Sequence, residues 1–125
     1  MITLTYPVPH TSPVTQTYAE HVARGLRNYN GGIDFAVPTG TPVRAAADGI
    51  VMRVGMDTTG YGEHVRVLHD DGYMTLYAHL RAAAVITGTV IAAGHVIGYS
   101  DNTGNSTGPH LHFELRQNGR AIDPA

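Results

Sequence analysis

Short segments of strand-forming residues, separated by glycine-containing turns, dominate this sequence and limit the folds open to it. The chain holds 15 glycines and 7 prolines in 125 residues, and the runs between them are rich in valine, isoleucine, tyrosine and threonine. Such runs bounded by turn residues are typical of β-strands. We predict strands over Val43–Ala46, Ile50–Met56, His64–His69, Met74–Leu80, Val85–Thr87, Val96–Ser100 and His110–Arg116. Regular short strands with tight turns predict an all-β, antiparallel sandwich or barrel-like sheet.

The length of 125 residues suits a single domain over residues 1–125 with one modest core. Residues 1–13 carry three prolines and are expected to be an irregular lead-in. The one segment with a helical pattern, Tyr18–Leu26, has only a weak one. Asp70-Asp71-Gly72 lies between two predicted strands and indicates a hairpin turn.

The predicted last strand, His110–Arg116, alternates strictly between polar and apolar residues. This period of two is typical of a strand with one buried face. Leu111, Phe113 and Leu115 therefore point into a core, and His110, His112 and Glu114 share the opposite face. Alternate side chains on a strand lie about 6.5–7 Å apart, which suits one histidine on a metal ion and the other beside it.

Two further residues are candidate partners for these histidines. In the predicted strand up to Leu80, Met74, Leu76, Ala78 and Leu80 are expected on the apolar face, with His79 on the other. Asp34 is flanked by Ile33 and Phe35, and a carboxylate in such a place is costly to bury without a partner. Histidine and aspartate are suitable zinc ligands, and a catalytic zinc has three protein ligands and one open position.

Composition excludes several classes of function. The net charge is −2, and the eight cationic residues are arginines that form no basic run, so nucleic acid is not an expected partner. The absence of cysteine excludes disulfides and thiolate metal sites, and the absence of lysine excludes a lipoyl or biotinyl carrier. We expect no membrane span and no secretory signal, because no apolar run is long enough and the start lacks a basic segment.

A series of motifs runs along the chain: Gly32–Ala36 with Pro38–Val43, Ala47–Val51, Gly60–Gly62, Tyr77–Leu80, Gly94–Gly98 and Ser106–Glu114, followed by Asp123-Pro124. Their order resembles that of the LytM/lysostaphin-type zinc endopeptidases, peptidase family M23. The resemblance implies a duplicated-hybrid-motif fold, with a central antiparallel sheet and a groove walled by four loops. These loops are expected at about residues 18–30, 57–62, 81–89 and 101–109.

The family resemblance implies a role for each matching residue. Asp34 and His112 fall on zinc ligands, and His79 and His110 fall on the two catalytic histidines that do not bind the metal. One zinc ion per domain is implied, and the implied substrates are the peptides of bacterial peptidoglycan.

Asn30 stands where the family has its first zinc histidine, four residues before Asp34. A neutral amide is a weaker zinc donor than imidazole. Three outcomes follow. Asn30 ligates through its carbonyl oxygen in a weaker working site, or His21 completes the ligand set, or the domain binds metal poorly and is a degenerate, non-catalytic module that grips the cell wall or a partner.

Two other residues are candidates for supporting roles. Glu114 either orients a site histidine or is a partly exposed surface residue. Tyr61, in a loop between two glycines, either lines the substrate groove or covers the core. We expect a monomer that acts on the cell wall, as a phage lysin or as a domain excised from a larger secreted or virion protein.

Overall fold

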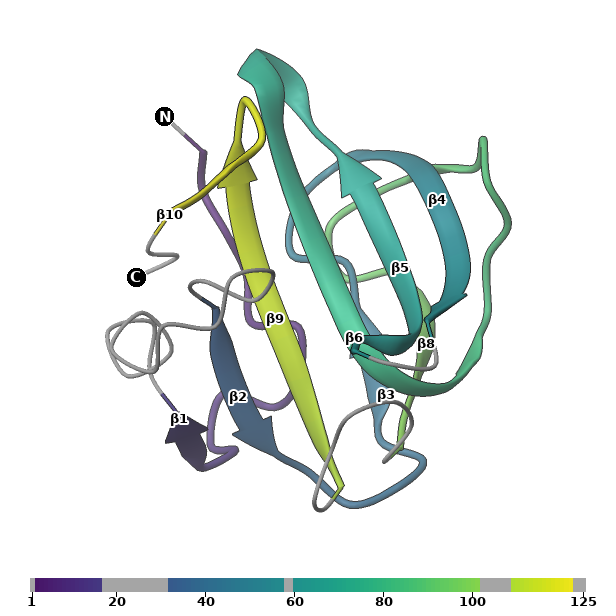
Figure 1. Cartoon of the computed structure of the whole chain (residues 1–125). Helices are drawn as coiled ribbons and strands as arrows, with labels where there is room; N and C mark the ends of the chain where they lie inside the picture. Colours follow the sequence, from purple (N-terminus) through teal and green to yellow (C-terminus); the bar gives the residue numbers. More distant parts are fainter. Residues whose placement is uncertain (1, 17–31, 58–59, 102–108, 123–125) are drawn as a thin grey trace.

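The computed structural model describes residues 2–16, 32–57, 60–101 and 109–122, which form an antiparallel β-structure (Figure 1). Its strands are β1 (Val14–Gln16), β2 (Ile33–Ala36), β3 (Pro42–Arg44), β4 (Gly49–Asp57), β5 (Gly62–Leu68), β6 (Tyr73–Ala83), β7 (Val90–Ile91), β8 (Val96–Ser100), β9 (His110–Gln117) and β10 (Arg120–Ile122). The strand order is β1-β2-β9-β6-β5-β4-β7, with β10 on β9 and with β8 pairing both β6 and β3. The all-β prediction is confirmed.

The long β9 and β6 lie side by side at the centre of this sheet (Figure 1). Their register pairs Tyr77 with Phe113 and Ala78 with His112. The turn between β5 and β6 is the predicted hairpin, and its residue Asp71 has a φ of 59°. The predicted helix at Tyr18–Leu26 lies outside the described residues.

One predicted strand is wrong. Val85–Thr87 is not a strand, because the chain turns there: the Thr89 amide donates to the Ile86 carbonyl, and Gly88 has a φ of 94°. The side chain of Ile86 is exposed in this turn. The nearby strand is instead β7, which pairs with the start of β4.

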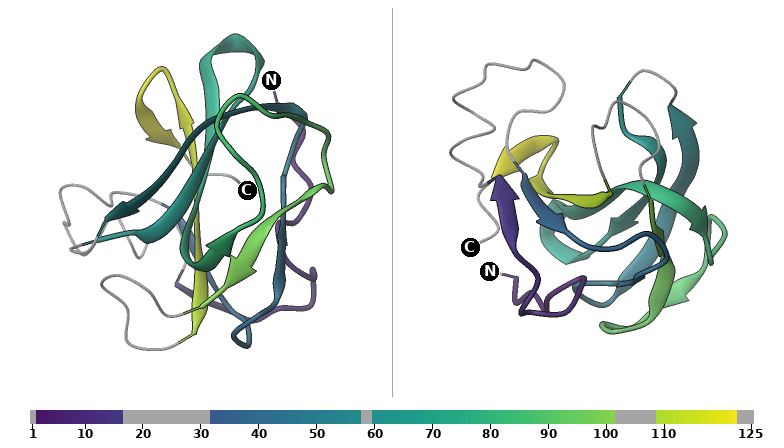
Figure 2. Two further views of the ribbon diagram at one scale, coloured as in Figure 1. Left: turned by 90° about the vertical axis from the view of Figure 1, so that its right-hand side faces the viewer. Right: turned by 90° about the horizontal axis from the view of Figure 1, so that it is seen from below.

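The main core lies between one face of the central sheet and the layer formed by β3 and β8 (Figure 2). Side chains from both layers are fully buried there, among them Val43, Val65, Tyr77, Ile97 and Leu111. The lead-in contains no strand over the described residues 2–13, but it is anchored, because Val8 is buried in this core and the Arg44 amide donates to the Pro7 carbonyl.

The opposite face of the sheet carries a smaller apolar cluster of Tyr61, Met74, Leu76 and Ala78. The predicted faces of β6 are therefore wrong in two respects: Leu80 packs in the main core with Tyr77 and not with Met74, and His79 lies beside His112, on the face that Ala78 shares. A bulge causes the difference. The register of β6 against β5 gains one residue between Tyr77 and Leu80, and His79 within this bulge has a φ of 62°.

Candidate active site

The pairing of β2 with β9 places an acid opposite a histidine. Asp34 is the register partner of His112, and the two side chains meet with 2.8 Å between Asp34 Oδ1 and His112 Nδ1. Gly32, just before β2, permits this close approach, because a Cβ there would lie 2.8 Å from Cε1 of His112 and 2.9 Å from the Phe113 carbonyl oxygen. The sequence prediction that Asp34 needs a buried partner therefore finds one in His112.

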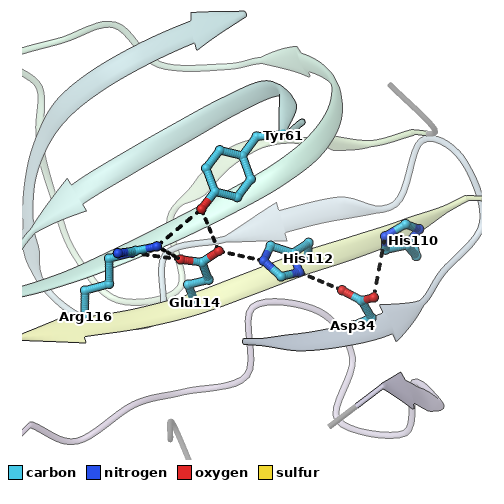
Figure 3. Close-up of polar contacts among 6 residues, drawn as sticks. All are labelled: Asp34, Tyr61, His110, His112, Glu114 and Arg116. Atoms are coloured by element: carbon cyan, nitrogen blue, oxygen red, sulfur yellow. Dashed lines mark hydrogen bonds and ion pairs between the residues drawn. The ribbon is translucent and has the colours of Figure 1, made fainter. Parts of the chain in front are cut away.

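The ring of His112 is buried and bound at both nitrogens. Its Nε2 lies 2.7 Å from Oε2 of Glu114, on the side of the ring opposite Asp34 (Figure 3). Burial acts to lower the pKa of His112, but the hydrogen bonds and negative charges of Asp34 and Glu114 outweigh it and raise the pKa to about 9. Without a metal, the ring is an imidazolium held between two carboxylates at neutral pH.

Glu114 is fully buried, so the surface alternative for this residue is wrong. Arg116 donates to its Oε1 through Nε at 2.8 Å, and the Arg116 Nη2 atom lies 2.7 Å from the same oxygen. The Tyr61 hydroxyl donates to Oε2 at 2.8 Å. Burial acts to raise the pKa of Glu114, but its bond to His112 and the charges of His112 and Arg116 hold that pKa below its ordinary value.

Tyr61 is also buried, and its ring stacks on that of His112 with centroids 5.9 Å apart and planes at 27°. Burial and the adjacent Glu114 carboxylate raise the pKa of Tyr61 well above its ordinary range, so its hydroxyl keeps its proton and acts as a donor. Of the two predicted roles, core cover fits the burial of Tyr61 in the cluster with Met74, Leu76 and Ala78. Tyr61 also touches two residues of the candidate site, His112 and Glu114.

His79 and His110 lie beside this group. Their ring centroids are 4.7 Å apart, and His79 lies 6.1 Å from the His112 ring. Nε2 of His110 is 3.8 Å from Oδ2 of Asp34. The bulge in β6 turns His79 out of the strand alternation, and a positive φ at a residue other than glycine is a local strain that is often found at functional sites.

Two predicted site residues, Asn30 and His21, lie outside the described part of the chain. Among the described residues, no group of three or more histidines, cysteines or acids is arranged to hold a metal ion. Asp34 and His112 are thus a pair of candidate donors.

Arg116 was missed at the sequence level. It stands two residues after Glu114 on the same face of the predicted strand, and this spacing was the available signal. Within the described residues no helix has the length and apolarity needed to cross a membrane.

The geometry and the sequence agree with a family model described as "Peptidase family M23", which matches residues 28–124. The chain belongs to peptidase family M23. The match includes every strand of the candidate site and extends over Asn30.

Among curated relatives of this M23 domain, the Neisseria meningitidis DD-carboxypeptidase/endopeptidase Mpg is 52% identical over 93 residues, which are 74% of this chain and 21% of the relative. The Vibrio cholerae peptidoglycan DD-endopeptidase ShyA is 40% identical over 111 residues, covering 89% of this chain and 24% of ShyA. The chain thus spans about a quarter of the length of the curated relatives it matches.

Solved structures share the M23 fold. A zinc containing peptidase from Vibrio cholerae superposes with a TM-score of 0.82 at 33% identity, over 94% of this chain and 37% of that one. The catalytic domain of a prophage-encoded M23 protein from Enterococcus faecalis, solved as a point mutant, gives a TM-score of 0.82 at 33% identity, over 96% of this chain and 94% of that domain.

Proposed function

We propose that this M23 domain is a zinc-dependent endopeptidase that hydrolyses peptide bonds of bacterial peptidoglycan. The observation that carries the proposal is the convergence of Asp34, His112, His110 and His79 from three neighbouring strands on one face of the sheet. The names of the relatives support the substrate class, since ShyA is called a peptidoglycan DD-endopeptidase. The prophage-encoded neighbour is compatible with a phage lysin as the setting.

Two of the described residues, Asp34 and His112, offer donor atoms that suit a zinc ion. An oxygen of Asp34 and a nitrogen of His112 face each other across 2.8 Å, and both are donor types that zinc prefers. The proton on Nδ1 of His112 has to leave when a metal ion binds, so zinc uptake releases protons. Asn30 is proposed as the third ligand, with His21 as the alternative.

A zinc ion held there supplies a Lewis acid that activates water and polarises the scissile carbonyl group. His79 and His110, beside the donor pair, are proposed to orient the attacking water, move its proton and stabilise the oxyanion. Their ring centroids lie 4.7 Å apart, and this proximity supports a shared role for the two imidazoles.

Replacement of Asn30 by histidine tests which donor completes the site. If Asn30 faces the metal, Asn30→His tightens zinc binding by about tenfold or more, because imidazole is the stronger zinc donor. Competition with a chromogenic chelator measures the affinity. The matched variants Asn30→Ala and His21→Ala separate the alternatives, since only the true ligand weakens zinc binding when it is removed.

A degenerate cell-wall-binding or structural module is the second candidate, and the asparagine at position 30 favours it. Purified cell walls decide between the two functions. The endopeptidase releases new amino groups from walls in a chelator-sensitive reaction, whereas the module sediments with the walls and releases none.

A further inference from the structure

The buried carboxylate of Glu114 contacts Tyr61 and Arg116 as well as His112. We propose that Tyr61 and Arg116 hold Glu114 as a clamp that fixes the ring and the tautomer of His112, and that both are positioning residues of the metal site. Tyr61, Glu114 and Arg116 are called the Glu114 clamp below. This inference rests on the proposed zinc endopeptidase function and adds residues to it.

The side chains of Arg116, Tyr61 and His112 all hydrogen-bond to the carboxylate of Glu114 (Figure 3). One oxygen receives both Arg116 nitrogens, and the other receives the Tyr61 hydroxyl at 2.8 Å and His112 Nε2 at 2.7 Å. Because Glu114 is fully buried, a carboxylate without these donors would be strongly destabilised. Its orientation is therefore fixed by its neighbours.

The fixed carboxylate decides which nitrogen of His112 faces Asp34. An ionised carboxylate accepts hydrogen bonds and cannot donate one, so Nε2 of His112 carries the hydrogen of its bond to Glu114. Nδ1 is then the nitrogen that remains for a metal ion on the Asp34 side. Outer hydrogen-bond partners of metal-binding histidines act in this way, by fixing the tautomer and raising the basicity of the ligand.

Tyr61 connects this arrangement to the other candidate histidine. Its ring stacks on His112, and its backbone carbonyl accepts the amide of His79 at 2.8 Å. His79 is the residue with a φ of 62° in the bulge of β6. Tyr61 therefore holds the backbone of His79 through its carbonyl group and the ring of His112 through stacking. One loop residue thus contacts both histidines of the candidate site.

Substitutions that remove one clamp contact at a time test the proposal. Glu114→Gln is expected to weaken zinc binding by about 10- to 100-fold, the usual effect of losing such a partner. Tyr61→Phe keeps the stacked ring and loses only the hydroxyl, so it weakens binding by less. Arg116→Lys keeps the charge but loses the two-nitrogen contact, since lysine offers one ammonium group.

Tyr77→Phe is the matched control. Tyr77 is also fully buried, and its hydroxyl contacts the Ala46 amide and Thr75 on the core face, away from the clamp. Its loss is expected to lower the melting temperature without a change in zinc affinity. The proposal is overturned if Glu114→Gln and Tyr61→Phe bind zinc as tightly as Tyr77→Phe does. Because Tyr61→Phe is the mildest change, it decides the matter if Glu114→Gln does not fold.

Nuclear magnetic resonance of ¹⁵N-labelled histidine gives a readout that depends on neither zinc nor lysis. In the metal-free protein, the Nε2 proton of His112 is expected to exchange slowly with water, and to exchange rapidly in Glu114→Gln. If the Nε2 proton of His112 exchanges slowly in the wild-type protein but the protein binds no zinc, the zinc endopeptidase function is contradicted and the Glu114 clamp is still supported. A wild-type protein that binds zinc with a rapidly exchanging Nε2 proton overturns the clamp alone.

Discussion

Asp34→Asn is expected to abolish cell-wall hydrolysis. It is also expected to reduce zinc affinity by more than the roughly 10- to 100-fold that follows from losing a residue that only hydrogen-bonds to a metal ligand. Asparagine has nearly the volume of aspartate, so the packing of β2 on β9 is kept. The change removes the negative charge that faces Nδ1 of His112 at 2.8 Å. Zinc content by mass spectrometry and release of amino groups from purified walls measure the two effects.

Asp48→Asn is the control for this change. Asp48 accepts the Ala93 amide at 2.8 Å in an exposed turn away from the candidate site. This variant is expected to keep zinc and hydrolysis at wild-type levels. If Asp34→Asn retained both as well, the carboxylate would not be a metal ligand.

His79→Asn and His110→Asn are expected to lower the hydrolysis rate by about 100- to 10,000-fold each, the range for loss of a general acid–base group. Asparagine is chosen because it tolerates the positive φ that His79 adopts. Both variants are expected to bind zinc normally, since neither histidine is placed as a ligand. Steady-state rates on cell walls, together with chelator competition, separate the two properties.

Loss of zinc binding in either variant would contradict the catalytic roles assigned to His79 and His110. A His79 or His110 variant that loses zinc would belong to the ligand set. His69→Asn is the matched control, because His69 is buried with its Nδ1 2.6 Å from the Asp48 carbonyl oxygen and its Nε2 2.8 Å from the Thr75 hydroxyl, and we assign it no role in catalysis.

The sequence was most informative where its alternation was strict. From Leu111 to Leu115 every side chain lies on its predicted face of β9, because successive side chains of a regular strand point to opposite faces of the sheet. The same rule failed at His79, where a bulge of one residue reversed the alternation and sent Leu80 to the main core. No local pattern marks such a bulge, since its cause is the pairing of β6 with β5.

Contacts between distant segments were the other limit. The stacking of Tyr61 on His112 joins residues 51 positions apart, and the 2.8 Å bond from Tyr61 to Glu114 spans 53 positions. The resemblance to family M23 placed Asp34 and His112 in one site, and the structure puts them in contact. It offered no role for Arg116 and did not connect Tyr61 with Glu114, because both contacts depend on the burial of Glu114.

Anomalous X-ray scattering at the zinc edge, from crystals of the protein soaked in zinc, tests the central claim most directly. The proposed site predicts one strong peak within bonding distance of both the Asp34 carboxylate and His112 Nδ1, with Glu114 still bonded to His112 Nε2. A map without a peak at that pair, or with its zinc elsewhere, would contradict the metal site and the hydrolysis that depends on it.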